Sequence, residues 1–306
     1  MSTEPSLYDA AIVGGGPAGL SAAIWLGRFL RSVVLVDSGD PRNWEARGVH
    51  GYLGLPDVLP KDLRGAGRDE ARRFGAELVD GYVRSAARLN EEHFRLILDD
   101  DQIFESRRLL LAFGIKDEWP EVPGLDQAYG ETVHHCPDCD GYEARGCKTV
   151  IIASGRKAAG MAFALTTWTR DLVICTNGEP ANIDAGLLAK LDQLNVPVLV
   201  DKITRMGSTE GQVRHLELAG GMALNCERIF FALGQYPADD LGVQLGCKRN
   251  DRNMIEVDRC QETTILNVYA AGDLVPGPHL AISAAAEGAI AAAAIHRSLL
   301  PEVCRL

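Results

Sequence analysis

The chain has 306 residues, of which 46% are hydrophobic and 24% charged, which is ordinary for a globular protein large enough to form two domains. Its 31 Lys and Arg residues against 42 Asp and Glu give a formal net charge of −11, which argues against a nucleic-acid partner and against docking on an anionic membrane surface. No window approaches the roughly 20 apolar residues of a membrane span, and residues 1–8 lack a secretory-signal pattern. We therefore expect a cytoplasmic protein whose thiols stay reduced unless they have a function.

The first part of the chain alternates short β-branched apolar runs with helical patterns. Helices are predicted at 18–29 and 61–75 and a hairpin turn at 99–102. The predicted strands are 9–13, 32–37, 94–98 and 107–113. The segment 115–124, with two prolines and several charges, then has the composition of a linker.

A second block of alternating elements follows that linker. Its predicted helices are 158–169 and 185–194, and a second break lies near 236–242. Its predicted strands are 149–153, 172–176, 196–200, 213–218 and 228–233. After the break the chain returns to a strand at 267–271 and an alanine-rich helix at 280–295. Strand–helix alternation in two blocks predicts an α/β protein with two Rossmann-like, doubly wound domains.

Gly14, Gly16 and Gly19 form a G-x-G-x-x-G pattern between a predicted strand and a predicted helix. The first glycine allows the tight turn, the second lets backbone approach a pyrophosphate, and the third lets helix pack on strand. The helix N-terminus favours the anion, and Asp37, at the end of the next strand, can accept hydrogen bonds from a ribose. The pattern predicts a dinucleotide site without separating NAD from FAD.

A second feature favours FAD. Gly272 and Asp273 lie between the predicted strand at 267–271 and the alanine-rich helix. This arrangement resembles the flavoprotein element whose aspartate binds the ribityl chain.

Cys136 and Cys139 form a C-x-x-C pair, a spacing that lets two thiols close a small disulfide ring. Asp140 follows directly and is a carboxylic acid placed to shuttle the proton. The competing interpretation is half of a zinc site, but the adjacent His134 and His135 cannot easily join one tetrahedron and no second C-x-x-C exists. The other six cysteines stand alone, and we expect small buried hydrophobic residues at Cys147, Cys175, Cys226, Cys247, Cys260 and Cys304.

Over nearly its whole length the chain resembles the thioredoxin-reductase-like, FAD-dependent pyridine nucleotide-disulfide oxidoreductases of the low-molecular-weight class. The resemblance rests on GGGPAG at 14–19, LLLAFG at 109–114, CPDCDGYE at 136–143, FFALGQYP at 230–237 and YAAGD at 269–273. It implies a discontinuous FAD domain of residues 1–116 and 243–306. An NAD(P)H-binding-like domain of residues 117–242 would be inserted and carry the C-x-x-C at its start. The resemblance also implies a homodimer.

The resemblance further implies roles for individual residues. Cys139 would be the flavin-proximal thiol, Cys136 the interchange thiol that meets the substrate, and Asp140 the acid/base. The implied FAD contacts, including those already derived, are Gly14, Gly16, Pro17, Ala18, Gly19, Asp37, Arg42, Asn43, His50, Val83, Ala112, Gly114, Gly272, Asp273, Leu280 and Ala281.

The chain departs from that family where the second dinucleotide site is expected. Ala153, Gly155 and Ala158 occupy the three fingerprint positions, and a methyl group at the first of them crowds the turn. The strand at 172–176 is not followed by the arginine pair that holds the 2′-phosphate of NADPH in typical members. His279-Leu280 stands where they carry Arg-Gln. We therefore expect the inserted domain to keep its fold but to have weakened or lost NADPH binding.

Three functions follow from these residues. The first is a reductase in which FAD, reduced by a donor other than ordinary NADPH, reduces Cys136–Cys139 and then a thioredoxin-like disulfide. The second is a dithiol oxidase that forms a disulfide in a small molecule with O₂ as acceptor; such enzymes often carry a histidine directly after the second cysteine, so Asp140 favours the reductase. The third is a flavin redox sensor, which the complete set of both cysteines and an acid/base disfavours.

Overall fold

The computed structural model describes residues 6–304. Of residues 1–8, in which the sequence shows no secretory-signal pattern, residues 1–5 therefore lie outside the described part of the chain. The chain divides into two compact units. Unit 1 comprises Met1–Trp44, Tyr52–Lys116 and Tyr236–Leu306, and unit 2 comprises Glu45–Gly51 and Asp117–Gln235. The chain thus re-enters unit 1 at the start of the predicted break at 236–242, earlier than the domain boundary expected at 242/243. The assignment of Glu45–Gly51 to unit 2 had no signal in the sequence.

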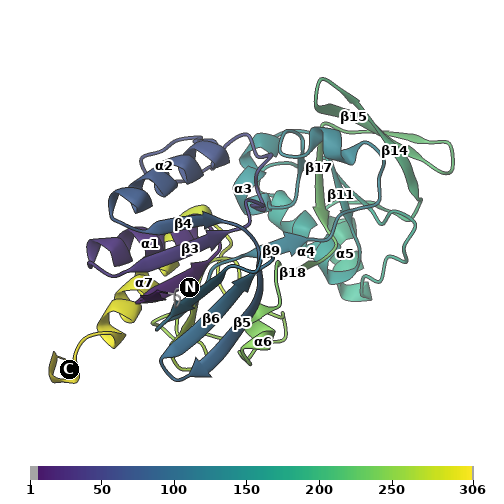
Figure 1. The fold of residues 1–306 in the computed structure, drawn as a ribbon. Coiled ribbons are helices and arrows are strands. Elements are labelled where there is room, and N and C mark those ends of the chain that lie inside the picture. The colour runs from purple at the N-terminus through teal and green to yellow at the C-terminus, as the bar shows by residue number, and fades with distance from the viewer. Residues whose placement is uncertain (1–5, 305–306) are drawn as a thin grey trace. The chain divides into compact units, whose positions relative to one another are not determined.

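Unit 1 is built on a five-stranded parallel sheet (Figure 1). In spatial order its strands are β19 (Val268–Ala270), β8 (Leu109–Leu111), β2 (Ala10–Val13), β3 (Val33–Asp37) and β4 (Glu77–Asp80). Every residue of β2, β3, β8 and β19 is buried, which explains why these segments are continuous apolar runs rather than alternating ones.

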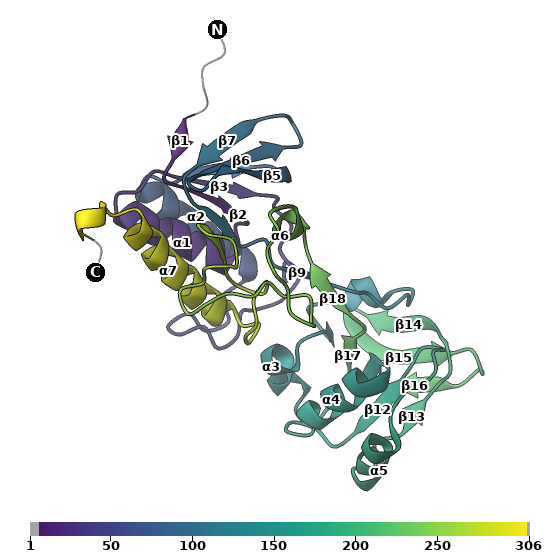
Figure 2. The same ribbon diagram turned by 90° about the horizontal axis from the view of Figure 1, so that it is seen from below.

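Helices cover one face of this sheet and an antiparallel sheet covers the other (Figure 2). The helices are α1 (Pro17–Arg28), α2 (Pro60–Arg73) and α7 (Ala281–Ser298). The antiparallel strands are β5 (Val83–Asn90), β6 (His93–Leu98) and β7 (Ile103–Ser106), with the short β1 (Leu7–Tyr8) parallel to β7. Successive residues of β2, such as Ile12 and Val13, therefore belong to separate hydrophobic cores on the two faces.

Unit 2 repeats this plan. Its parallel sheet has the order β10 (Val133–His134), β17 (Arg228–Ala232), β11 (Thr149–Ala153), β12 (Leu172–Cys175) and β13 (Val198–Leu199). The helices α4 (Gly155–Leu165) and α5 (Ala185–Gln193) cover one face. The antiparallel strands β14 (Ile203–Thr209), β15 (Gln212–Leu218) and β16 (Ala223–Asn225) cover the other (Figure 1). Both units are thus mixed α/β and Rossmann-like, with β-strands rather than helices as the third layer.

The remaining described elements are short. They are β9 (Ile115–Asp117) paired with β18 (Gln235–Pro237), α3 (Pro137–Asp140), α6 (Leu241–Gln244), and the 3₁₀ turns η1 (Leu125–Ala128), η2 (Tyr142–Ala144) and η3 (Glu302–Cys304). Among the described residues, no helix combines the length and apolarity needed to cross a membrane.

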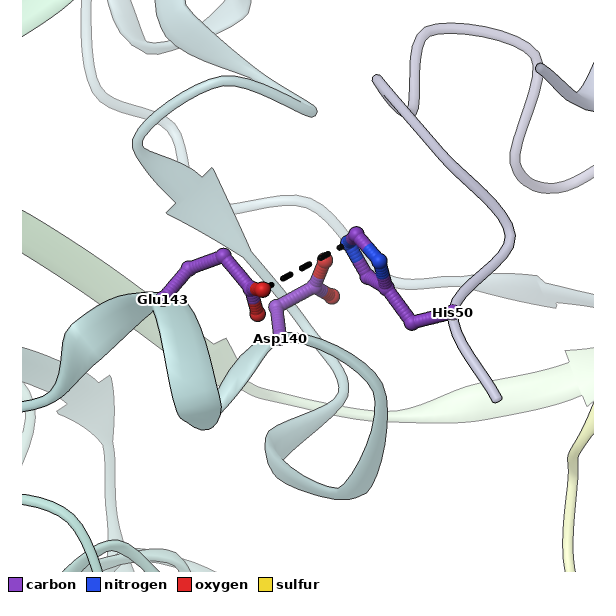
Figure 3. Close-up of side chains that lie close together, drawn as sticks. All are labelled: His50, Asp140 and Glu143. Atoms are coloured by element: carbon purple, nitrogen blue, oxygen red, sulfur yellow. Dashed lines mark ion pairs between the residues drawn. The ribbon is translucent and has the colours of Figure 1, made fainter. Parts of the chain in front are cut away.

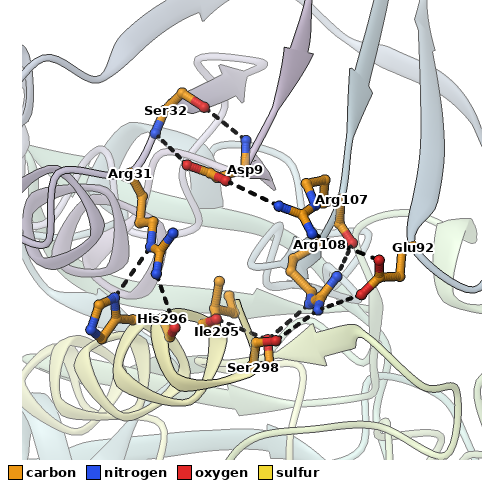
Figure 4. A network of polar contacts seen from close by, with 9 residues as sticks. All are labelled: Asp9, Arg31, Ser32, Glu92, Arg107, Arg108, Ile295, His296 and Ser298. Atoms are coloured by element: carbon orange, nitrogen blue, oxygen red, sulfur yellow. Dashed lines mark hydrogen bonds and ion pairs between the residues drawn. The ribbon is translucent and has the colours of Figure 1, made fainter. Parts of the chain in front are cut away.

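A network of hydrogen bonds and ion pairs holds the C-terminal end of α7 in unit 1 (Figure 4). The side chain of Arg108 is only 2% exposed, and it donates to Ser298 Oγ at 2.8 Å and to the Ser298 carbonyl at 3.0 Å. Arg31 donates to the His296 carbonyl at 3.4 Å. The Arg108 guanidinium therefore satisfies the Ser298 carbonyl, and Arg31 adds a second donor to the His296 carbonyl, which also accepts from the Leu299 N–H.

The lone cysteines differ from our expectation. Cys175, Cys226 and Cys247 are buried, as predicted, and Cys147 is only partly buried. Cys260 and Cys304 are exposed, so the prediction is wrong for them. Cys260 lies in a turn where its backbone N–H bonds to Asp258 Oδ1 at 2.8 Å, and such turns lie at the surface.

Candidate active site

The glycine pattern of unit 1 forms a tight turn between β2 and α1. Gly14 has φ of +109°, and a Cβ on it would lie 2.3 Å from the Ala112 carbonyl oxygen. A Cβ on Gly19 would lie 1.9 Å from the Gly14 carbonyl oxygen, so the helix can approach the turn only because Gly19 has no side chain. Gly16 is the N-cap of α1, with Pro17 at the first helical turn.

The turn has the free space that a pyrophosphate needs. A Cβ on Gly16 would meet nothing within 4 Å, in contrast to Gly14 and Gly19. The positive end of α1 and its unpaired N–H groups lie at this opening. Gly272 and Asp273 follow β19 after one residue, Ala271, so they share the carboxyl edge of the sheet with Gly14 and Ala112. These features fit the diphosphate and ribityl groups of FAD.

Asp37 is buried at the end of β3 and is paired with arginines that the sequence analysis did not identify. Its Oδ2 accepts from Arg64 and, at 2.9 Å, from Arg68, while Oδ1 accepts from the Gly39 N–H at 3.2 Å. Arg64 and Arg68 stand four residues apart on α2 and therefore project from one face. A carboxylate has about four acceptor positions, so these contacts leave Asp37 able to bind a ribose as well.

Other expected FAD contacts lie around the same sheet edge of unit 1. Arg42 pairs with Asp273 at 3.0 Å. Leu280 is the N-cap of α7 and Ala281 its first residue. The remaining positions are Asn43 in the loop after β3, Val83 at the start of β5, and Gly114, which has φ of +72° after β8. His50 is the exception, because it belongs to unit 2.

Cys136 and Cys139 are joined by a disulfide in unit 2. Cys136 is the N-cap of α3, and the backbone N–H of Cys139 donates to its Sγ at 3.1 Å. Pro137 occupies the first turn, where its missing N–H costs no hydrogen bond. A hydrogen bond from a backbone N–H stabilises a thiolate, so the geometry favours Cys136 as the attacking sulfur once the disulfide is reduced.

Asp140 ends α3 and is mostly buried, with 17% of its side chain exposed. Burial raises the pKa of its carboxyl from 3.8 to about 6, and the Glu143 carboxylate also raises it, while His50 lowers it. The imidazole of His134 lies 3.5 Å away, but burial lowers the pKa of His134 to about 3. Asp140 can therefore gain and lose a proton near neutral pH, whereas His134 stays neutral.

Two further side chains, His50 and Glu143, lie beside Asp140 (Figure 3). His50 Nε2 lies 3.9 Å from Glu143 Oε1, and one nitrogen or oxygen of each of the three residues lies within 4.8 Å of the others. Glu143 belongs to the quoted CPDCDGYE segment, so its three-residue spacing from Asp140 was an available signal. The proximity of His50, about ninety residues away in the chain, had no such signal.

The corresponding nucleotide turn of unit 2 is built differently. β11 continues through Ala153, which pairs with Ala232, and the left-handed residue is Gly155, with φ of +61°. The Gly155 N–H donates to the Ala181 carbonyl at 2.7 Å, and the Lys157 ammonium bonds to the Leu233 carbonyl. Beyond β12, Asn177 Oδ1 accepts from the Ile203 N–H at 2.8 Å. Three polar groups at this turn and beyond β12, the Gly155 N–H, the Lys157 ammonium and the Asn177 side chain, are thus bonded to the protein's own backbone.

Comparison with known proteins identifies the family to which the chain belongs. A family model described as pyridine nucleotide-disulphide oxidoreductase matches residues 8–288. The thioredoxin reductase of Bacillus subtilis (strain 168) is 24% identical over 96% of this chain and 95% of its own. The crystal structure of HlmI has a TM-score of 0.91 and 31% identity, covering 97% of this chain and 94% of that one. The putative thioredoxin reductase TrxB from Bacillus anthracis has a TM-score of 0.88 and 27% identity, covering 95% and 98%.

The chain therefore belongs to the pyridine nucleotide-disulphide oxidoreductase family. Within it, the protein is an FAD-dependent disulfide oxidoreductase of the thioredoxin-reductase-like kind.

Proposed function

We propose that this enzyme uses the Cys136–Cys139 dithiol to reduce the disulfide of a thioredoxin-like protein, and that its FAD is reduced by a donor other than NADPH. The thioredoxin reductases to which the chain is similar over nearly its whole length support the choice of substrate. The observation that carries the choice of donor is the closed nucleotide turn of unit 2, where the Gly155 N–H is bonded to Ala181.

The two glycine turns differ at the position where a pyrophosphate would approach. A Cβ on Gly16 of unit 1 would meet open space, whereas one on Gly155 of unit 2 would lie 3.4 Å from the Asn182 carbonyl oxygen. A carbonyl oxygen next to a phosphate oxygen is repulsive, and a bonded N–H is lost to the ligand. NADPH would have to displace this loop before it could bind.

The chemistry of the dithiol is thiol–disulfide exchange. The Cys136 thiolate attacks one sulfur of the substrate disulfide, forming a mixed disulfide and releasing the other substrate sulfur as a thiolate. The Cys139 thiolate then attacks Cys136, which closes the Cys136–Cys139 disulfide and releases the second substrate sulfur. Two protons from the enzyme dithiol end on the two substrate thiols, so one disulfide is reduced as the other forms. FAD, when bound, supplies the electron pair that restores the dithiol.

Asp140 is placed to carry those protons. As a carboxylate it can take the proton of a cysteine thiol, and as an acid it can give a proton to the leaving substrate thiolate. A pKa of about 6 suits both tasks near neutral pH. The substitution Asp140→Asn should slow exchange by about 10²- to 10³-fold, because it removes general acid–base catalysis.

Anaerobic stopped-flow mixing tests the donor and the substrate separately. NADPH should leave the flavin absorbance unchanged, whereas dithionite should bleach it, and the dithionite-reduced enzyme should then convert an oxidised thioredoxin to its dithiol. Rapid stoichiometric bleaching by NADPH would refute the proposed donor. Failure to reduce thioredoxin, with hydrogen peroxide formed from a small dithiol in air, would favour the dithiol oxidase instead.

A further inference from the structure

His50 and Glu143 flank the carboxyl group of Asp140 with groups of opposite charge (Figure 3). Glu143 lies in η2, one turn beyond Asp140, and His50 comes from Glu45–Gly51, a segment distant in sequence that belongs to the same unit. The side chains of His50 and Glu143 are 28% and 35% exposed, whereas that of Asp140 is 17% exposed. The most buried of the three groups thus has an atom within 4.8 Å of two groups that reach solvent.

The other titratable groups near Asp140 do not provide a second pair of this kind. His134 Nδ1 lies 3.5 Å from Asp140 Oδ1, but this imidazole is buried and uncharged at neutral pH. Arg228 and His135 lower the pKa of His134, and neither is among the groups that shift the pKa of Asp140. Within the described residues, Glu143 Oε2 is buried without a hydrogen-bond partner, so the Glu143 carboxylate is not neutralised by a full set of donors.

We propose that His50 and Glu143 are positioning residues that act through Asp140 in opposite directions, the imidazolium of His50 stabilising its carboxylate and the carboxylate of Glu143 stabilising its acid. This inference rests on the proposed function, because it assumes that Asp140 is the acid/base of the dithiol. A positively charged neighbour lowers the pKa of a buried carboxyl and a negatively charged one raises it, so the two effects offset each other. Asp140 can then donate in one step of exchange and accept in the next.

The test measures one half-reaction that needs neither NADPH nor thioredoxin. The FAD-loaded protein is reduced with dithiothreitol, desalted anaerobically and mixed with bis(2-hydroxyethyl) disulfide over a range of pH. Exchange is followed as the 2-mercaptoethanol released, alkylated and measured in quenched samples, because flavin reduced by dithiothreitol would restore the Cys136–Cys139 dithiol after the first exchange. The leaving alkyl thiolate needs a proton, so the rate should fall as Asp140 ionises, and Asp140→Asn should abolish that limb of the profile.

The two variants should move this limb in opposite directions. Loss of the imidazolium in His50→Gln should move it to higher pH, and loss of the carboxylate in Glu143→Gln should move it to lower pH, each by about half to one unit for partly solvated charges at this separation. The double variant should return the limb close to its wild-type position. A merely structural role would leave the limb in place or shift it in the same direction in both variants, and either result would overturn the inference.

A matched control uses a histidine–glutamate pair elsewhere in unit 2. His215 Nε2 lies 3.6 Å from Glu217 Oε1 on β15, and this pair is not among the groups that shift the pKa of Asp140. The substitution His215→Gln should leave the limb unmoved. If a variant folds too poorly for kinetics, isotope-edited infrared titration of the aspartate carboxyl in the double variant and the wild type measures the same ionisation.

The outcomes distinguish the acid/base role of Asp140 from the positioning roles of His50 and Glu143. If the wild-type profile has no limb that Asp140→Asn removes, the acid/base role in the proposed function fails. If that limb exists but His50→Gln and Glu143→Gln do not displace it in opposite directions, only the present inference fails.

Discussion

The two cysteines of the redox pair differ in their surroundings. Cys136 accepts a hydrogen bond from the Cys139 N–H, which stabilises a thiolate at Cys136 and favours it as the sulfur that meets the substrate. We expect Cys139→Ser to accumulate a stoichiometric mixed disulfide between Cys136 and an oxidised thioredoxin, because the resolving thiol is missing. Intact-protein mass spectrometry measures this adduct. An adduct formed by Cys136→Ser but not by Cys139→Ser would reverse the two assignments.

Asp140 also has a consequence for stability. Its pKa is raised to about 6 in the folded protein, so the fold binds this proton more tightly than the unfolded chain does. The resulting stabilisation is complete below pH 3.8 and is lost as pH rises through about 6, by about 3 kcal/mol in all. Asp140→Asn should therefore raise the thermal midpoint relative to wild type above pH 6, with a gain that shrinks in acid. A constant difference at all pH values would contradict this.

The sequence could predict part of this site. Cys136, Cys139 and Asp140 are adjacent in the chain, so their spacing alone suggests joint chemistry. His50 and the pair Arg64 and Arg68 could not be assigned in this way, since their contacts with Asp140 and Asp37 depend on how distant segments fold together. Resemblance placed His50 with FAD, but it did not indicate a position beside Asp140.

The turn between β2 and α1 allows a test of where the pyrophosphate of FAD binds. A methyl group at Gly16 meets no protein atom within 4 Å, and Gly16 has φ of −80°, so Gly16→Ala should fold. The methyl group would occupy the space where the pyrophosphate approaches. We expect this variant to be purified with little flavin and a wild-type far-UV circular dichroism spectrum.

Gly19→Ala is the matched comparison. Its methyl group would lie 1.9 Å from the Gly14 carbonyl oxygen, so α1 would have to move away from the sheet. This variant should lose thermal stability as well as flavin. Full flavin content in Gly16→Ala would show that the opening at the helix N-terminus is not where FAD binds.

The anchoring of α7 depends on Arg108. Its side chain is almost fully buried, and its removal would leave the Ser298 carbonyl of the last helical turn without this donor. Arg108→Met should lower the unfolding free energy by about 3 kcal/mol, measured as a fall in the urea midpoint. Arg107→Met is the control, because Arg107 is 39% exposed and its ion pairs are long, at 3.7 and 4.0 Å, so it should cost less than about 0.5 kcal/mol.

Most long elements could be predicted because their pattern is local. β2, β3 and β11 are continuous apolar runs, and α2 has charged residues around a narrow apolar face. Strands of the third layers were harder to predict, as β5 and β14 are largely exposed and polar along much of their length. Their strand conformation depends on pairing with neighbours, which a sequence window does not contain.

In the whole molecule, each unit has a five-stranded parallel sheet with a strand followed by a nucleotide-type turn at its centre, β2 in unit 1 and β11 in unit 2, whereas the edge strand beside β8 or β17 comes last in the chain in unit 1 (β19) and first in unit 2 (β10). The units also differ in the turn after the central strand, GGGPAG in unit 1 and ASGRKA in unit 2. We expect these six residues in each unit to decide whether the turn binds a dinucleotide. This contrast between the two turns is visible in the sequence, whereas the backbone bond from Gly155 to the loop at Ala181 could not be predicted from it. The homodimer stays a prediction that sedimentation analysis can check.

If the turn in unit 2 does not bind NADPH, as we propose, electrons can still reach the flavin through the Cys136–Cys139 pair. Thiol–disulfide exchange is reversible, so a strongly reducing dithiol can run the dithiol chemistry in reverse and load the enzyme from the substrate side. Excess dithiothreitol in the absence of oxygen should bleach the flavin absorbance of the wild type, while NADPH should not. Cys136→Ser and Cys139→Ser should both resist dithiothreitol and still be bleached by dithionite, which confirms that their flavin is reducible. If dithiothreitol bleached both variants as fast as the wild type, electrons would be reaching the flavin without the Cys136–Cys139 pair, and that pair could not be the obligatory relay between flavin and substrate.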